Sequence, residues 1–408
     1  MSPRFSDALP VWTKIGLLSF GGPAGQIALM QDEVVTRRGW VKPESFDRGL
    51  AFSMMLPGPE AQQLATWLGW RLHGLWGGLA AGLAFIVPGM VLMIVLAWVA
   101  AAHGEVPWVA AVFAGVQPIV IALVLGAMRK IAGRALSGSF HWALAIAAFA
   151  ALYFAHVPFP LVIAAAAITG LFLPGAADTA PPESGPNVFG HVVRIIGVAA
   201  VLIAALFFTV RATLGVEPFD DVAQLFTTAA LVTFGGAYAV LPFVAEQAVE
   251  TYGWLGPADM LNGLAIAEAT PGPLILVNTY AGYFAGWATA PEFSAGMTTA
   301  LLATVYTFAP SFALILAFAP SVERLHTIPW ARRALAGVSA AVVGVIANLA
   351  VYLGEAAFLP NEISDPEWIK IALFAVAMIA VFVLRVGMVA LIGGGIVAGL
   401  FLHLIGLL

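Results

Sequence analysis

Long uninterrupted apolar runs dominate this chain, and short polar segments separate them. The longest runs cover residues 75–102, 106–128, 192–210 and 295–319. Each is long enough to cross a hydrocarbon core about 30 Å thick as an α-helix. Helical periodicity within the runs is weak, as it is in helices that are apolar on all sides. The pattern predicts an all-α polytopic membrane protein.

Glycine and proline interrupt this apolar pattern at two kinds of break, and each kind occurs twice. Phe20-Gly21-Gly22 matches Phe234-Gly235-Gly236, and Pro57-Gly58-Pro59 matches Pro271-Gly272-Pro273. Both matches have an offset of 214 residues, and residues 20–59 share 13 identities with residues 234–273 without a gap. Such breaks, repeated in two halves of a membrane protein, indicate a transport site.

The repeat divides the chain into two halves, residues 1–174 and 219–408. The linker between them, residues 175–218, contains a polar loop rich in Pro, Gly and Ser and one apolar helix without a counterpart in the first half. One extra span between homologous halves inverts the second half relative to the first. We therefore predict an inverted-topology repeat joined by one extra helix.

Charge placement favours this inversion. Between its two breaks the first half carries Arg37, Arg38, Lys42 and Arg48, whereas the matching segment of the second half carries Glu250 and Asp259 and no Lys or Arg. Because Lys and Arg are enriched in cytoplasmic loops, the two segments are expected on opposite sides of the membrane.

The segments beside the breaks allow two arrangements. The arms at 10–20 and 23–35 are each roughly 15–20 Å long as helices, so they form either kinked full spans or re-entrant hairpins with the breaks at their tips. In the hairpin arrangement the full spans are 74–102, 106–128, 141–156, 158–173 and 191–214. It places 15 of the 17 Lys and Arg on the cytoplasmic side, all except Arg211 and Lys370. We favour the hairpins and keep kinked spans as the alternative.

Composition narrows the function classes. The chain is 61% hydrophobic and 10% charged, and it has no cysteine, which excludes disulfides and thiolate chemistry. The seven histidines are scattered without a pair at helical spacing, and no nucleotide-binding or nucleophile motif is present. We expect no enzyme activity, no catalytic or metal site, no cofactor and no nucleic-acid partner.

The breaks themselves predict the chemistry of the site. Glycine stops a helix and a following proline starts a new one, and each new helix start presents free N–H groups and about half a positive charge. Irregular backbone persists at membrane depth only where it is buried in protein or lines a cavity. Four such starts near the membrane midplane would suit an anion. The alternative is that the small residues only permit close helix packing.

The predicted substrate-binding residues are those of the breaks and the polar residues near them. They are Ser19, Phe20, Gly21, Gly22, Pro23, Gln26, Arg48, Pro57, Gly58, Pro59, Glu60, Gln62, Arg71, Thr233, Gly235, Gly236, Tyr238, Thr270, Pro271, Gly272, Pro273 and Asn278, with Gln63 and Asn262 nearby. Ser19 and Thr233 occupy matching positions before the two Phe-Gly-Gly breaks, and their hydroxyls can donate to an oxyanion.

Four charged residues near the breaks are further candidates, and three of them have a second reading. Arg48 and Arg71 offer the forked donor geometry that suits tetrahedral oxyanions, and equally they are typical of cytoplasmic interfacial anchors. Glu60 and Glu268 lie near the Pro-Gly-Pro breaks, where a carboxylate at membrane depth can carry a coupling proton. The alternative for Glu60 is stabilisation of its own helix start.

The two breaks, the Arg38-Gly39-Trp40 step and the Gln62 that follows Pro57-Gly58-Pro59 resemble the chromate transporter family in its long, two-domain form. The resemblance covers nearly the whole chain. It implies an inner-membrane protein that exports chromate, with sulfate as a similar competitor, driven by the proton gradient. The motif residues implicated in this way are Phe20–Pro23, Gly39, Trp40, Pro57–Pro59 and their second copies. The second half departs from the pattern, because Ala237 replaces Pro23 and Leu274 replaces Glu60, so a chemically asymmetric site is expected.

The leading hypothesis is a secondary active transporter that exports chromate, a tetrahedral divalent oxyanion similar to sulfate. It would move chromate across the lipid bilayer of the inner membrane by alternating access. The alternatives are a passive anion channel, a transporter of another oxyanion such as sulfate, and an intramembrane enzyme, for which no nucleophile–base pair is evident. The direction of transport, the coupling ion and the oligomeric state, a homodimer included, stay open at this point.

Overall fold

The computed structural model describes residues 3–172, 189–321, 329–359 and 367–407, and within these ranges every regular element is helical. The first segment forms α1 (Phe5–Leu18), α2 (Gly22–Gln31), α3 (Pro43–Ser53), α4 (Glu60–His103), α5 (Pro107–Ala135), α6 (Ser139–Tyr153) and α7 (Phe159–Gly170). After α8 (Phe189–Leu214) come α9 (Phe219–Val232), α10 (Ala237–Glu246), α11 (Pro257–Ala269), α12 (Val277–Thr289), α13 (Phe293–Phe318), α15 (Pro329–Phe358), α16 (Trp368–Phe382) and α17 (Met388–Leu404).

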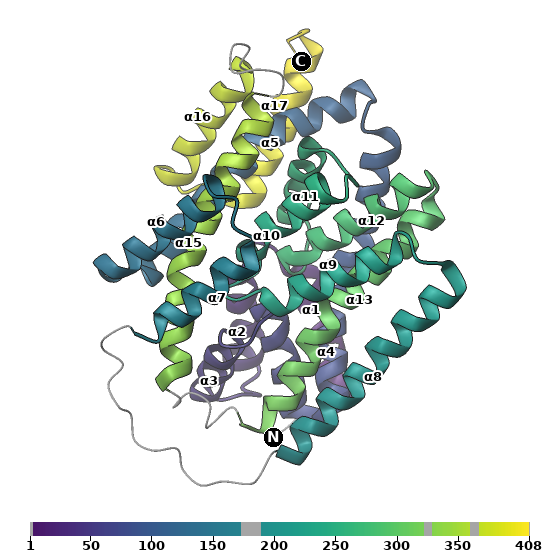
Figure 1. Ribbon diagram of the computed structural model, residues 1–408, viewed down its shortest axis with the longest axis vertical. Helices are drawn as coiled ribbons and strands as arrows, with labels where there is room; N and C mark the ends of the chain where they lie inside the picture. Colours follow the sequence, from purple (N-terminus) through teal and green to yellow (C-terminus); the bar gives the residue numbers. More distant parts are fainter. Residues whose placement is uncertain (1–2, 173–188, 322–328, 360–366, 408) are drawn as a thin grey trace.

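Five helices in the described part of the chain are long and apolar enough to cross a membrane, namely α4, α5, α8, α13 and α15. They confirm the prediction of an all-α polytopic membrane protein. The extra helix α8 runs along the outside of the molecule (Figure 1). Its most hydrophobic window is 0% buried within the protein, as a lipid-facing span requires.

Helices α6 and α7 are shorter than the spans predicted at 141–156 and 158–173. They have 15 and 12 residues, or roughly 22 and 18 Å of helix, so neither crosses a 30 Å core alone. The positive φ of 47° at His156 and the proline at Pro158 separate them. In Figure 1 both lie beside α15.

The same backbone conformations recur at matching positions of the two segments. Each Phe-Gly-Gly and Pro-Gly-Pro break contains glycines with positive φ, a region that other residues rarely occupy, such as Gly58 at 126° and Gly272 at 100°. A π-helical turn follows both α2 and α10, and Gly39 and Gly253 beyond these turns both have φ of 62°. Local structure therefore repeats along with the sequence.

Helix α4 bends where the second segment has two separate helices. His73 and Gly74 leave the helical conformation, so that residues 60–72 and 75–103 point in different directions. In the second segment α12 ends at Thr289 and α13 begins at Phe293, which places the interruption at the matching point.

The two segments exchange their last pairs of helices. Helices α6 and α7 pack on α15, whereas α16 and α17 pack on α5 (Figure 1). Glycines allow both contacts: a Cβ at Gly337 of α15 would lie 2.3 Å from the Ala166 carbonyl oxygen of α7, and one at Gly399 of α17 would lie 2.1 Å from that of Ala111 on α5. Small residues permit this close approach between membrane helices.

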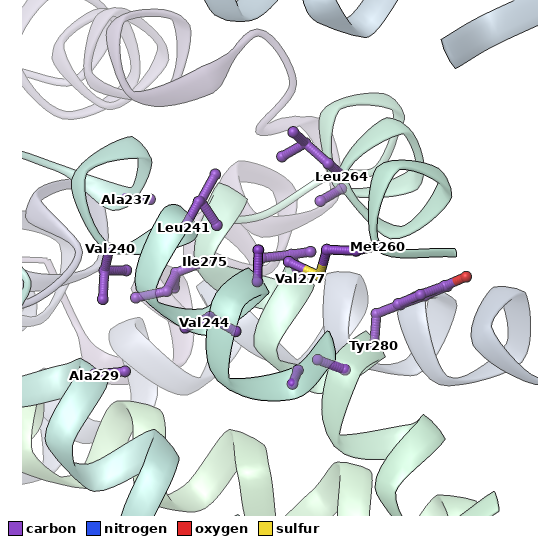
Figure 2. Packing of buried hydrophobic residues seen from close by; sticks show 14 of the residues in the cluster. Ala229, Ala237, Val240, Leu241, Val244, Met260, Leu264, Ile275, Val277 and Tyr280 are labelled. Atoms are coloured by element: carbon purple, nitrogen blue, oxygen red, sulfur yellow. The ribbon is translucent and has the colours of Figure 1, made fainter. Parts of the chain in front are cut away.

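The short helices beside the second pair of breaks are buried in the protein core. Figure 2 shows Leu241 and Val244 of α10 facing Ile275 and Val277, which follow the Pro-Gly-Pro break. These four side chains are fully buried. Apolar packing thus fixes the short helices on which the second pair of breaks is mounted.

Candidate functional site

The four breaks meet through a reciprocal pair of main-chain hydrogen bonds. The Gly58 N–H donates to the Thr233 carbonyl oxygen over 2.8 Å, and the Gly272 N–H donates to the Ser19 carbonyl oxygen over 3.0 Å. Gly58 matches Gly272 and Ser19 matches Thr233 in the repeat. Each Pro-Gly-Pro break is therefore joined to the Phe-Gly-Gly break of the other half.

A long helix of the opposite half lies against each Pro-Gly-Pro break. A Cβ at Gly89 of α4 would lie 2.1 Å from the Pro271 carbonyl oxygen, so the helix touches the backbone of the second break. At the first break, a Cβ at Gly58 would lie 2.7 Å from the Ser311 hydroxyl oxygen on α13. Pro88-Gly89 and Pro310-Ser311 match at an offset of 222 residues, because the second half is longer beyond the breaks. This repeated proline is the sequence signal for the contact.

Helices begin at all four breaks without side-chain caps. Helices α2, α4 and α10 start at Gly22, Glu60 and Ala237, and a 3₁₀ turn, Leu274–Leu276, starts after Pro273 and leads into α12. None of these starts has a side-chain cap hydrogen bond. Their first N–H groups lack intrahelical acceptors and carry the positive end of the helix dipole.

Ser19 and Thr233 fasten the breaks together. Both are fully buried, and their carbonyl oxygens accept the glycine N–H groups described above. Their hydroxyl groups donate to the carbonyl oxygens of Ile15 and Ala229 in the preceding helical turn. A hydroxyl has a single proton, so donation to an anion requires each side chain to rotate out of this conformation.

Buried amide side chains gather beside the breaks. Gln26 donates to the Gly272 carbonyl oxygen over 2.6 Å, and Gln63 donates to that of Pro57 over 2.7 Å. Gln62 accepts a hydrogen bond of 2.8 Å from Ser311, and Asn278 donates to Thr307 over 3.1 Å. The side-chain carbonyl oxygens of Gln26, Gln63 and Asn278 accept no hydrogen bond from the described residues. Four of the predicted polar side chains thus lie in the protein interior near the breaks, and Ser311 and Thr307 are hydrogen-bonded to two of them.

The two candidate carboxylates lie near the breaks of the second half. Tyr238 of α10 donates to Glu268, whose side chain is buried on α11. Glu60 approaches the start of α10, since a Cβ at Gly236 would lie 3.4 Å from its Oε2 atom. Lys130 and Arg134 of α5 act electrostatically on Glu268 and Glu60, respectively. Each carboxylate thus has one cation of α5 close enough to interact with it electrostatically.

Arg71 does not reach the breaks. Arg71 follows Glu60 by eleven residues on one straight stretch of α4, which corresponds to roughly 16 Å. The guanidinium groups of Arg71 and Arg48 both contact the Ser45 hydroxyl oxygen. The remaining candidates, Asn262 and Thr270, bond within the protein, because Asn262 accepts from Gln117 over 2.9 Å and Thr270 donates to Ala267.

An ion-pair cluster ties α1 to the turn after α2. The Glu33 side chain is 1% exposed, Lys14 lies 2.8 Å from its Oε1 atom, and Arg38 donates to its Oε2 atom. The hydrogen bonds from Lys14 and Arg38 lower the pKa of Glu33 below its ordinary value, against the opposite effect of burial. A carboxylate with a lowered pKa stabilises the fold above its unfolded-state pKa, and this contribution is lost as the pH falls through the folded-state pKa.

We therefore expect Glu33→Gln to reduce the free energy of unfolding by about 1–3 kcal/mol at neutral pH, because charged hydrogen bonds are replaced by neutral ones. The difference from the parent protein should vanish as the pH falls through the lowered folded-state pKa of Glu33, where the parent's carboxylate is protonated too. Thermal unfolding of purified protein between pH 3 and 7 measures it. Asp7→Asn, at an exposed acid on α1, serves as the control, and an equal loss in both variants would contradict the assignment.

Comparison with known proteins identifies a matching family and several similar proteins. The family described as "Chromate transporter" matches residues 7–171 and 221–400. The chain is 34% identical over 364 residues to the chromate transport protein of Pseudomonas aeruginosa, covering 84% of this chain and 79% of the relative. It is 28% identical over 341 residues to the probable chromate transport protein of Synechococcus elongatus (84% and 82%). An uncharacterized transporter of Methanocaldococcus jannaschii is 24% identical over 327 residues (79% and 78%). No solved structure matches the chain.

Proposed function

This chain belongs to the chromate transporter family, and on that premise we propose that it is a secondary active transporter that exports chromate across the inner membrane. The observation that carries the proposal is the reciprocal bonding of Gly58 to Thr233 and of Gly272 to Ser19. It joins four helix starts without side-chain caps in two pairs, inside a chain of membrane-spanning helices. Main-chain N–H groups at helix starts bind oxyanions such as chromate and sulfate.

We take the short helices at the breaks to be re-entrant hairpins. Lys14 and Glu33 form an ion pair although 19 residues separate them, a distance of roughly 28 Å along a continuous helix. Across the next break, Gly49 packs against the Trp67 ring, 18 positions further on. Contacts of this kind require the chain to double back at the break, and they favour hairpins over kinked full spans.

We also take residues 1–174 and 219–408 to be inverted repeats, with 175–218 as the connection that contains α8. The support is that each half makes the same contacts with the other. Each half packs its last two helices on a helix of the other half, and each half's Pro-Gly-Pro break bonds to the other half's Phe-Gly-Gly break. Such reciprocity is what a two-fold axis in the membrane plane produces. Rocking of the two halves about the breaks would then expose the anion to each side in turn.

Proton coupling belongs to Glu60 and Glu268 in this proposal. Glu268 is buried, and Tyr238 of α10 donates a hydrogen bond to it. A carboxylate at membrane depth is far less costly when protonated, so proton binding and movement of the halves can be linked there. Leu274 replaces Glu60 and Met54 replaces Glu268 at the matching positions. Each half therefore supplies one carboxylate, and the two carboxylates occupy different positions in the repeat.

The test is accumulation of radiolabelled chromate in everted membrane vesicles, with and without an imposed proton gradient and with excess sulfate as competitor. We expect gradient-dependent accumulation that Gly58→Leu reduces at least tenfold. The new side chain would meet Gln63 and Ser311 within 3 Å at a backbone φ of 126° and would separate Gly58 from Thr233. Overpacking of this kind costs about 1–3 kcal/mol, and 1.4 kcal/mol corresponds to a factor of ten.

Gly393→Leu is the matched control, because nothing lies within 4 Å of a Cβ at this glycine of α17. Equilibration of chromate without accumulation would contradict active transport and indicate a passive channel. An absence of chromate flux in correctly folded protein would redirect the assignment to another oxyanion.

A further inference from the structure

A groove with a volume of about 640 Å³ lies between α8, α9 and α13. All three helices line it, mostly with apolar side chains such as Ile203 of α8, Ala223 of α9 and Leu314 of α13. Volumes of about 300–1,000 Å³ are typical of sites that bind small molecules. Among the described residues that line the groove, none belongs to the four breaks, so it is a separate site.

The groove opens toward the membrane. Helix α8 runs along the outside of the molecule (Figure 1), and its most hydrophobic window is 0% buried within the protein. The lining residues Phe208 of α8 and Leu231 of α9 are 64% and 49% exposed. Because hydrocarbon surrounds such a surface in a membrane, the ligand that can enter the groove from the side is a lipid chain.

Two buried polar groups also line the groove. The hydroxyl group of Tyr306 on α13 and the Oδ1 atom of Asp220 at the start of α9 have no hydrogen-bond partner within the described part of the chain, and Tyr306 is 2% exposed. Asp220 acts electrostatically on Tyr306, so the two groups lie near each other. Buried polar groups are costly when they stay unpaired. A ligand that satisfies both accepts a hydrogen bond from the hydroxyl group and donates one to the carboxylate.

A cation lies beside the carboxylate. Arg211, in the last turn of α8, donates to the Oδ2 atom of Asp220, and its side chain is 48% exposed. Arg211 is also one of the two basic residues that the hairpin arrangement leaves on the outer side of the membrane. A guanidinium group next to a free carboxylate oxygen complements a headgroup that carries both a phosphate and an ammonium group.

We propose that the groove between α8, α9 and α13 binds a phospholipid with a primary ammonium headgroup, namely phosphatidylethanolamine. An acyl chain lies along the apolar lining, and the headgroup ammonium donates to Asp220. The phosphate binds Arg211, and an ester or phosphate oxygen accepts from Tyr306. Phosphatidylcholine has no N–H group to donate to Asp220, and phosphatidylglycerol brings a negative charge toward it. The inference goes beyond the proposed function and does not depend on the transported ion.

The walls of the groove also hold the first Pro-Gly-Pro break. Helix α9 leads into Thr233, whose carbonyl oxygen accepts a hydrogen bond from the Gly58 N–H. On α13 the lining residue Pro310 precedes Ser311, whose hydroxyl oxygen would lie 2.7 Å from a Cβ at Gly58. A lipid in the groove therefore packs on both helices that position this break.

The experiment measures thermal unfolding of the purified full-length chain in detergent while lipids with identical oleoyl chains are titrated. We expect phosphatidylethanolamine to raise the unfolding midpoint by about 3–5 °C at saturation, because a ligand of the folded state stabilises it by mass action. Phosphatidylcholine and phosphatidylglycerol should each give less than half of this rise. Native mass spectrometry of the same samples should show the retained lipid.

Tyr306→Phe removes only a hydroxyl group that has no protein partner in the described residues. In lipid-free detergent its unfolding midpoint should therefore be no lower than that of the parent, whereas its apparent affinity for phosphatidylethanolamine should fall about fivefold. Tyr283→Phe is the matched control, since Tyr283 is 0% exposed and its hydroxyl group is equally unpaired, but it lies on α12 and does not line the groove. It should bind the lipid like the parent.

Two further pairs of variants test the headgroup and the chain. Asp220→Asn should abolish the preference for phosphatidylethanolamine over phosphatidylcholine, and Asp221→Asn, at an acid outside the lining, should keep it. Ala204→Trp places a large ring in the groove and should remove lipid stabilisation, whereas Ala205→Trp, at the next and exposed position of α8, should not.

Three results would each overturn the site. The first is an equal or larger rise of the unfolding midpoint with phosphatidylcholine or phosphatidylglycerol. The second is an unchanged affinity in Tyr306→Phe, or an equal loss in Tyr283→Phe. The third is equal behaviour of Ala204→Trp and Ala205→Trp. Because none of these measurements uses transport, failure of the lipid site is distinct from failure of the proposed function.

Discussion

Gly89→Ala should reduce transport at least tenfold although it adds a single methyl group. The new Cβ atom would lie 2.1 Å from the Pro271 carbonyl oxygen and 2.6 Å from a methyl group of Leu276, so α4 must move away from the second Pro-Gly-Pro break. That movement pulls on Gly272, whose N–H bonds to Ser19. Overpacking costs about 1–3 kcal/mol, and we expect at least a tenfold loss of chromate accumulation in vesicles.

Gly197→Ala provides the comparison, since it makes the same change in a helix where nothing lies within 4 Å of the new atom. This variant should transport like the parent protein. Membrane insertion and melting temperature of both variants should be measured, so that loss of transport is read only on folded protein. Full transport by a folded Gly89→Ala protein would show that the contact between α4 and the break has no part in function.

Glu268→Gln should remove the pH dependence of transport. The residue is 2% exposed, its carboxyl group accepts a hydrogen bond from Tyr238, and it lies next to the break that Gly272 joins to the other half. An amide keeps the size and hydrogen bonding of the side chain but cannot take up a proton. We expect the parent's rate to change about tenfold between pH 6 and 8 and that of the variant less than twofold, in proteoliposomes with buffered interiors.

Asp259→Asn, on the same helix, separates proton coupling from a general effect of charge. Asp259 accepts a hydrogen bond from the Gly256 N–H in the first turn of α11, away from the breaks, and its variant should keep the parent's pH profile. Glu60→Gln tests the second carboxylate in the same assay. A parent-like pH profile in Glu268→Gln would remove Glu268 from the coupling step.

The positions of the helix breaks could be predicted because glycine and proline have strong local conformational preferences. Gly21, Gly58 and Gly272 all lie at interruptions between helices, and each has a positive φ. The Gly-Pro starts of new helices follow from the missing N–H of proline. The fold class followed from hydropathy alone, because long apolar segments have few alternatives to a membrane helix.

The contacts between the breaks could not be predicted. Gly58 bonds to Thr233 through main-chain atoms 175 positions apart, and every residue type offers the same N–H and C=O groups. Side-chain identity therefore contains no signal for which break meets which.

The role of Arg71 could not be predicted either, because only the packing of α3 on α4 brings Ser45 to it. Helices α6 and α7 were predicted too long, since apolar composition continues past their ends.

The seam between the halves consists of backbone hydrogen bonds, and this has an evolutionary consequence. After a duplication, most substitutions can alter one copy without deleting the N–H of Gly58 or the carbonyl group of Thr233. Each copy can then specialise while the pair stays assembled, as the replacement of Glu60 by Leu274 and of Arg48 by Asn262 illustrates. A single copy, by contrast, would leave one donor and one acceptor unpaired in a medium that offers no water, so each half depends on a partner half for these bonds.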